Sequence, residues 1–213
     1  METRSRVIQS QRQPLVNMTI TPGHFATRNS HINYYVDLTS IKSNHVMAKL
    51  AAEELAATET GTIPVDTIVC LDGTEVVAAF LAETISAKEL RGINRHGAIV
   101  VLTPEINTSG QLMFRDNYQK MINHKNILLL VAQATTGITI TQAIECIDYY
   151  RGRTIGIHAL FSAIDRIRGM SINSIFPRDY VADYSTYQPV ECPSCKAKHK
   201  IDALVNSYGY SKI

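Results

Sequence analysis

The chain has 213 residues, of which 45% are hydrophobic and 19% charged, a balance that excludes a mainly disordered protein and allows a sizeable buried core. Its 21 basic and 19 acidic residues give a net charge of +2, which argues against nucleic acid or a membrane surface as a partner. No apolar run is long enough to span a bilayer, and no secretory signal is recognised. Two of the four cysteines lie in apolar runs, and we expect a cytoplasmic protein with reduced thiols.

Short apolar strands alternate with helical periodicity along most of the chain. In chain order we predict a helix over 43–57, a strand over 66–71, a helix over 74–87, strands over 98–102 and 126–131, a helix over 136–150 and a strand over 154–161. This alternation predicts βαβ units, and therefore an α/β fold with a parallel sheet and flanking helices. Ligands of such sheets bind beyond the carboxyl ends of the strands, so the residues that follow each strand are the candidates for a site.

The segment after the strand over 126–131 carries the most informative motif. It links this strand to the next helix through Thr135, Thr136, Gly137, Ile138 and Thr139. Backbone N–H groups at a helix N-terminus favour an anion, glycine allows close approach of the backbone, and threonine hydroxyls add donors. The motif therefore predicts a turn that binds a phosphate group. The alternative is a plain helix cap without a ligand.

Three segments together resemble type I phosphoribosyltransferases, most closely the orotate phosphoribosyltransferases. The apolar strand followed by residues 135–139 is similar to the signature that holds the 5-phosphate of phosphoribosyl pyrophosphate (PRPP). Residues 23–37 (GHFATRNSHINYYVD) resemble the hood segment that helps to cover the base, although they are one residue shorter than usual. The place of the family's pyrophosphate loop, after a strand, is taken by Asp72, Gly73, Thr74 and Glu75. The three segments come in the family's order, and the resemblance covers about residues 18–165.

Two departures from the family pattern bear on activity. Aligned on Thr-Thr-Gly, the family's acidic pair, which holds the ribose hydroxyls near the bound magnesium, falls on Val131 and Ala132. No basic residue lies between Gly97 and Phe114, where orotate enzymes usually carry an arginine and lysines that close over pyrophosphate. Loss of one such preorganised contact costs roughly 3 kcal/mol of transition-state stabilisation. Either the usual chemistry is absent or other residues substitute, the candidates being Asp72, Glu75, Glu105 and Arg115.

The resemblance implies a phosphoribosyltransferase-like (Rossmann-like) fold with a small N-terminal hood, in a single domain over residues 1–213. The parts of this domain would be an N-terminal arm (1–17), the hood (18–40), the α/β core (41–178) and a tyrosine-rich tail with a CxxC motif (179–213). Within the hood, Phe25 and Arg28 would lie over the base.

The function that the resemblance implies is a transferase of nucleotide metabolism, in pyrimidine biosynthesis. Such a protein transfers phosphoribose from PRPP to a nucleobase, releases pyrophosphate and uses Mg²⁺, and members of the family are commonly homodimers. The alternative is a non-catalytic regulator that binds PRPP or a nucleotide, which the missing acidic pair favours.

The CxxC motif of the tail is a candidate metal site. Cys192 and Cys195 offer two of the four ligands that a structural zinc ion requires, and His199 is the expected third. A fourth ligand would come from elsewhere in the chain or from a partner. The alternatives are a surface turn without metal and a redox-sensitive pair of thiols.

Overall fold

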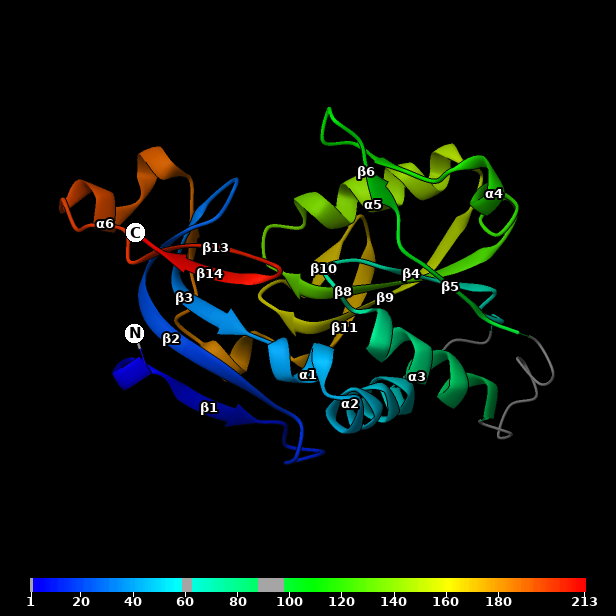
Figure 1. Ribbon diagram of the computed structural model, residues 1–213, viewed down its shortest axis with the longest axis horizontal. Coiled ribbons are helices and arrows are strands. Elements are labelled where there is room, and N and C mark those ends of the chain that lie inside the picture. Colours follow the sequence, from blue (N-terminus) through cyan, green and yellow to red (C-terminus); the bar gives the residue numbers. More distant parts are fainter. Residues whose placement is uncertain (1, 59–62, 88–97) are drawn as a thin grey trace.

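A six-stranded, mostly parallel sheet forms the centre of the molecule. The computed structural model describes residues 2–58, 63–87 and 98–213. The central sheet has the order β10-β11-β9-β8-β4-β5, and only β10 runs antiparallel to its neighbour (Figure 1). Its strands are β4 (Thr67–Cys70), β5 (Val100–Leu102), β8 (Asn126–Ala134), β9 (Arg153–Ser162), β10 (Arg166–Ile167) and β11 (Met170–Phe176).

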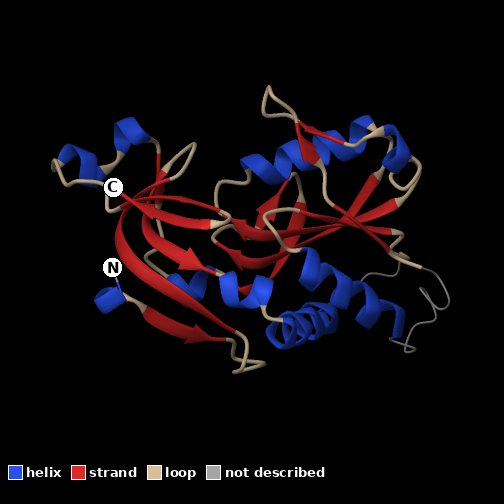
Figure 2. Cartoon of the chain, in the orientation of Figure 1, coloured by secondary structure: helices blue, strands red, loops and turns tan. Residues whose placement is uncertain are grey.

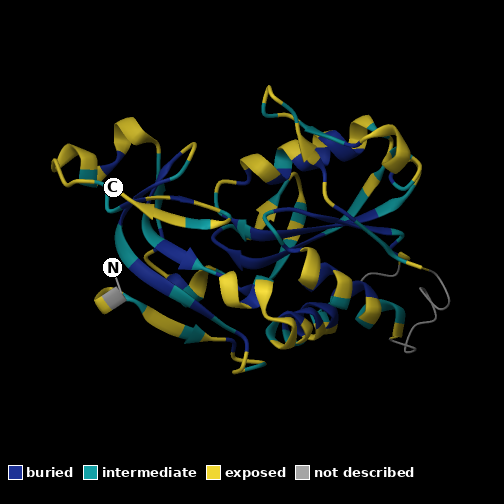
Figure 3. Ribbon diagram, viewed as in Figure 1, coloured by how far each residue is buried: buried dark blue, intermediate teal, exposed yellow. Residues whose placement is uncertain are grey.

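Helices cover both faces of this sheet. On one face lie α2 (His45–Thr58) and α3 (Glu75–Ala87), and on the other lies α5 (Ile138–Tyr149) (Figure 2). Side chains of a strand alternate between the two faces, so Leu128 and Leu130 pack with α2 and α3, whereas Leu129 and Val131 pack with α5. These strands are buried on both sides, which explains why β8 is a continuous apolar run (Figure 3).

A second sheet, which we call the hood sheet, lies beside the central one. Its order is β12-β3-β2-β13-β14, with β1 paired to β2. Its strands are β1 (Arg6–Gln9), β2 (Asn17–Ala26), β3 (His31–Asp37), β12 (Thr186–Tyr187), β13 (Ala203–Asn206) and β14 (Gly209–Lys212). Both ends of the chain therefore meet in one sheet, and Figure 1 shows the red C-terminal strands beside the blue N-terminal ones.

Short elements connect these layers. A two-stranded hairpin, β6 (Glu105–Ile106) and β7 (Leu112–Met113), stands apart from both large sheets. The short helical elements are η1 (Glu2–Arg4), α1 (Thr39–Ser43), α4 (Asp116–Gln119), η3 (Arg178–Val181), η4 (Pro189–Glu191) and α6 (Pro193–Lys196). Within the described ranges, no helix has the length and hydropathy needed to cross a bilayer.

The structure confirms the predicted α/β class and the parallel sheet. The helices predicted over 43–57, 74–87 and 136–150 are present with ends shifted by one or two residues, and the strand predicted over 126–131 runs on to Ala134. Part of the predicted N-terminal arm forms β1, which lengthens the hood sheet instead of standing free.

A buried hydrogen bond between Ser10 of the N-terminal arm and Glu54 of α2 allows the packing of the two segments to be tested. Glu54 is only 9% exposed, and Ser10 Oγ lies 2.7 Å from its Oε1 and donates a hydrogen bond. Burial raises the pKa of Glu54, opposed by the Ser10 hydrogen bond and by the charge of Arg12. A raised folded-state pKa means that stability is lost as the pH rises above about 4.5, where the buried carboxyl must ionise.

We therefore expect Glu54→Gln, which keeps an acceptor for Ser10, to stabilise the protein by about 0.5–1 kcal/mol at pH 7. The difference from the unmodified chain should vanish at pH 4, where Glu54 is protonated. Urea unfolding at the two pH values measures both. The exposed neighbour Glu53 supplies the control, since Glu53→Gln should stay within about 0.5 kcal/mol of the unmodified chain at either pH. A Glu54→Gln protein that is less stable at pH 7 would contradict the expectation.

Candidate functional site

A cleft of about 310 Å³ opens between the central sheet and the hood sheet. Its floor is the carboxyl end of β8 with the turn that follows, which is where ligands of parallel sheets bind. Three other segments surround it: the turn and strand at residues 27–39, the β6–β7 hairpin, and the turn between β13 and β14. The cleft is thus built from segments that lie far apart in the sequence.

Residues 135–139, which we call the phosphate turn, shape the floor of the cleft. Gly137 is the N-cap of the twelve-residue helix α5 and has φ 77°, a left-handed conformation that favours glycine. A Cβ at this position would also collide with Cδ1 of Ile167. The N-terminus of α5, where the backbone N–H groups have no partner within the helix, thus lies at the cleft, and the residues that line the cleft here are Thr135, Thr136, Ile138 and Thr139.

The three threonine hydroxyls of the phosphate turn are free to take a ligand. None of them makes a hydrogen bond to any residue that the structure describes. By contrast, the hydroxyl of Thr74 is used internally: Thr74 is fully buried, and its Oγ1 donates to the carbonyl of Leu71 at 2.8 Å. The hydroxyl of Thr74 is thus already used within the fold, whereas those of the phosphate turn remain available to a ligand.

Only one of the four residues predicted for the pyrophosphate side lines the cleft. Asp72 does so, with φ 61°, whereas Thr74 is enclosed at the start of α3. Glu75 is exposed outside the cleft and accepts a hydrogen bond from Thr103 Oγ1 at 2.9 Å. Gly73 forms the turn with φ 75° and is not part of the lining. Of these four residues the structure places Asp72 in the lining of the cleft, whereas Thr74 and Glu75 stand at the start of α3.

Lys42 supplies a positive charge to the cleft that no sequence motif indicated. It comes from α1, and its Nζ donates to the carbonyl oxygens of Asp72, at 3.0 Å, and of Ser207. Burial lowers the pKa of Lys42, and the nearby carboxylates of Asp72, Asp37 and Glu75 oppose this. Lys42 therefore joins the pyrophosphate side of the cleft to the C-terminal segment.

Two carboxylates and a neutral phenol accompany this lysine. Asp37 and Asp72 both line the cleft. Burial raises the pKa of the Asp72 carboxyl, whereas the Lys42 charge and a hydrogen bond from the backbone N–H of Ala132 lower it. Tyr35 also lines the cleft, and burial raises the pKa of its phenol to about 12.

Of the two residues predicted to lie over the base, Arg28 lines the cleft and Phe25 does not. Phe25 is fully buried and packs against Tyr35, with ring centroids 6.1 Å apart, so its ring belongs to the core of the hood sheet. This corrects the prediction: the irregular pairing between Pro22 and Phe25 shifts the alternation of β2, so that Phe25 is buried as Met18 and Ile20 are. Arg28 lies in the exposed turn between β2 and β3 and does line the cleft. Its guanidinium comes within 3.1 Å of where a Cβ on Gly110 would be, so the hood turn approaches the β6–β7 hairpin.

The two positions that correspond to the family's acidic pair hold buried apolar side chains. Val131 is 1% exposed and packs with α5, whereas Ala132 is 2% exposed and lies at the cleft floor. The candidates Glu105 and Arg115 bind each other across the β6–β7 hairpin, with Nη2 and Oε1 2.6 Å apart on the exposed surface. Of the proposed substitutes, only Asp72 therefore reaches the cleft.

A second group of side chains with possible ligand atoms lies in the hood sheet. Cys192 and Cys195 come together with His24 and His31, and the four ligand atoms all lie within 4.8 Å of one another. His199, the expected third ligand, is not a member of this group. Its backbone carbonyl instead lies 3.1 Å from Nδ1 of His24, and the residue is exposed.

Comparison with solved structures gives the fold its name. The chain superposes on UMP synthase from Leishmania donovani with a TM-score of 0.55 and 13% identity, over 76% of this chain and 34% of that one. It matches a phosphoribosyltransferase from Corynebacterium diphtheriae with a TM-score of 0.51 and 16% identity, over 75% and 91% of the two chains. For orotate phosphoribosyltransferase from Aeropyrum pernix the values are 0.51 and 15%, over 76% and 90%.

The chain has the phosphoribosyltransferase fold. No family model matches the sequence, and no curated protein matches it either. Because the sequence identities are only 13–16%, these comparisons show a shared fold and nothing more. The chain spans about a third of the length of the Leishmania UMP synthase and nearly the full length of the other two.

Proposed function

We propose that this protein binds PRPP in the cleft and transfers its phosphoribosyl group to a nucleobase, with release of pyrophosphate. The observation that carries the proposal is the phosphate turn. It is a left-handed glycine at the N-terminus of a long helix, flanked by three threonine hydroxyls that have no hydrogen-bond partner among the described residues, and it opens into the cleft of a phosphoribosyltransferase fold. A helix N-terminus of this kind favours a phosphate group.

The remaining cleft residues suit the rest of such a ligand. Lys42 and Arg28 offer positive charge to pyrophosphate oxygens, and Asp37 and Asp72 offer carboxylates to ribose hydroxyls. In this proposal the two aspartates take over from the missing acidic pair. The side chains of Val131 and Ala132 do not fit a magnesium ion, since neither offers a ligand atom, so no step is assigned to the metal there.

A second candidate function rests on Ala132. A methyl group at the floor of the cleft neither holds a ribose hydroxyl nor stabilises charge, and the hairpin over the cleft carries no lysine. Under this alternative the protein is a regulator that binds PRPP or a nucleotide without turnover. We further propose orotate as the first base to test and a homodimer as the assembly, the latter to be measured by analytical ultracentrifugation.

Phosphorus NMR separates these functions. Purified protein is mixed with PRPP and Mg²⁺, first alone and then with single bases, beginning with orotate. Pyrophosphate that forms with one base and not with the others is the expected result. Broadening of the PRPP signals without pyrophosphate would favour the regulator. Unchanged signals with every base would overturn both candidates.

Arg28 gives a smaller test of the same cleft. Because its guanidinium is exposed and reaches the cleft from one side, we expect Arg28→Ala to weaken PRPP binding about fivefold and to leave stability unchanged. Isothermal titration calorimetry measures the affinity. Arg153 is an exposed arginine at the amino end of β9, and Arg153→Ala should change neither quantity. Equal affinities of the two variants would remove Arg28 from the proposed site.

A further inference from the structure

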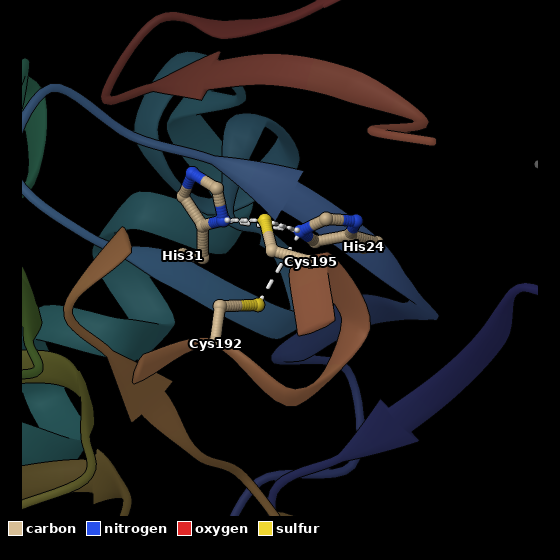
Figure 4. Close-up of side chains that lie close together, drawn as sticks. All are labelled: His24, His31, Cys192 and Cys195. Carbon is tan, nitrogen blue, oxygen red and sulfur yellow. Dashed lines mark hydrogen bonds between the residues drawn. The ribbon is translucent and has the colours of Figure 1, made fainter. Parts of the chain in front are cut away.

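The group formed by His24, His31, Cys192 and Cys195, which we call the His/Cys cluster, joins the β2–β3 hairpin to α6, two parts of the chain that lie far apart in the sequence. His24 lies in β2 at the irregular pairing between Pro22 and Phe25, and His31 begins β3. Cys192 is the N-cap of α6 and Cys195 lies within it. Figure 4 shows the four side chains pointing toward one common centre.

The spacing of the ligand atoms is that of a tetrahedral metal site. His24 Nε2 lies 3.0 Å from His31 Nδ1 and 3.4 Å from Cys192 Sγ, and Cys195 Sγ lies 3.3 Å from His31 Nδ1. Zinc at about 2.0–2.1 Å from nitrogen and 2.3 Å from sulfur places nitrogen and sulfur ligands about 3.5 Å apart around a tetrahedron. The distances therefore leave room for one ion at the centre of the His/Cys cluster.

The surroundings of His24 orient its ring for this purpose. Nδ1 lies 3.1 Å from the carbonyl oxygen of His199 and 3.2 Å from that of Lys200. A carbonyl oxygen can only accept, so Nδ1 carries the hydrogen and Nε2 directs its lone pair at the His/Cys cluster. Histidine ligands of metals commonly donate their other N–H to a carbonyl in this way.

Burial and composition point to the same conclusion. Three of the four ligands are buried, with His24 6% exposed, His31 9% and Cys192 2%, whereas Cys195 is exposed; the two cysteines form no disulfide. Two imidazoles and two thiols form a donor set that zinc prefers and that calcium or magnesium, which take oxygen ligands, does not.

We propose that the His/Cys cluster binds one zinc ion through His24 Nε2, His31 Nδ1 and the two cysteine sulfurs. All four positions of the tetrahedron are then taken by the protein, which is typical of a structural site and not of a catalytic one. The ion fastens α6 to the β2–β3 hairpin. Residues beyond α6 form β13, which pairs with β2, and the following Asn206 and Ser207 line the cleft. The zinc ion thus holds the C-terminal wall of the cleft in place, independently of which reaction the cleft performs.

Metal analysis of the full chain tests the site. Protein expressed with added zinc and purified without chelator should contain about one zinc per chain by plasma mass spectrometry. Cys195→Ser and His31→Gln should each lower the content to less than a third. His199→Gln is the matched control, because only the backbone carbonyl of this residue approaches the His/Cys cluster, and it should keep the full equivalent.

Cobalt substitution shows the ligands even if a variant folds poorly. The unmodified protein, stripped with chelator and given Co²⁺, should show intense visible bands of tetrahedral cobalt and a near-ultraviolet thiolate-to-cobalt band. The proposal is overturned if folded protein holds less than a tenth of an equivalent of zinc and shows no such bands. A Cys192–Cys195 disulfide in the freshly purified protein, detected by mass spectrometry, would overturn it as well.

Hydrogen exchange tests the structural role. Removal of zinc should speed deuterium uptake at least tenfold in residues 190–212, while β8 and β9 keep their protection. Added Zn²⁺ should reverse the change and Mg²⁺ should not. Unchanged uptake in the C-terminal segment after complete zinc removal would overturn the role assigned to the ion. Because this readout requires no PRPP, it stays valid whether or not the proposed transferase activity is found.

Discussion

Gly137→Ala is expected to weaken binding of ribose 5-phosphate about 10- to 100-fold. The left-handed conformation at φ 77° costs a non-glycine residue roughly 1–2 kcal/mol, and the new methyl group also displaces Ile167. The start of α5 must then shift, which misaligns the N–H groups that face the cleft. A hydrogen bond to a charged group is worth about 1.5–3 kcal/mol, so the loss of one accounts for the expected change. Calorimetric titration with ribose 5-phosphate measures it.

A second glycine separates this effect from backbone strain. Gly169 has φ 83°, but a Cβ there would meet nothing within 4 Å. Gly169→Ala should therefore cost stability of similar size, about 1–2 kcal/mol, without altering the affinity. If Gly137→Ala binds ribose 5-phosphate as tightly as Gly169→Ala does, the phosphate turn is a helix cap and nothing more.

Lys42→Met is expected to lower the free energy of unfolding by about 2–4 kcal/mol and to weaken PRPP binding at least tenfold. The substitution leaves the carbonyls of Asp72 and Ser207 without their donor, and it removes the cation beside a buried carboxyl. Urea unfolding and calorimetry measure the two effects. Lys49 of α2 is exposed, so Lys49→Met should change stability by less than about 0.5 kcal/mol.

The stability defect of Lys42→Met should depend on pH. Burial already raises the pKa of Asp72, and the charge of Lys42 opposes this rise. Without Lys42 the pKa of Asp72 rises further, so the folded state holds its proton more tightly and loses stability as the pH increases. We expect a larger defect at pH 8 than at pH 4, because the raised pKa of Asp72 leaves less of its charge to be compensated at the lower pH. A defect that is equal at the two pH values would show that the Asp72 charge plays no part.

The central sheet could be predicted from the sequence because its signals are local. The apolar run of β8 and the helical periodicity of residues 136–150 each specify an element within a dozen residues. The hood sheet could not be predicted in the same way. It pairs Phe25 with Ala203, and its strands are held together by contacts between the two ends of the chain, which no local pattern records.

The residues of the candidate site likewise fall into those that a local sequence pattern predicts and those that only the packing of distant segments brings together. The phosphate turn and Asp72 follow strands and could be predicted from that position. Lys42 could not, since it belongs to no motif and reaches the cleft only through the position of α1. Asp37 ends the segment that resembles the hood, but its place in the cleft follows from the position of β3. His24 and His31 escaped notice because their spacing of seven residues matches no common ligand pattern. Both histidines lie in the segment that resembles the hood, on two strands that pair with each other. This pairing brings them together and is the signal that could have linked them to the CxxC motif.

The arrangement of the hood sheet also dictates the order in which a growing chain can complete this protein. Residues 39–176 contain the whole central sheet and its covering helices, so this part can assemble while synthesis continues. The hood sheet cannot assemble at that stage. The backbone N–H of His24 donates to Asp202, which is made 178 residues later, and the edge of β2 has no partner strand at Phe25 and Ala26 until β13 is made. The cleft, whose lining includes Asn206 and Ser207, therefore becomes complete only when the C-terminal segment has been made.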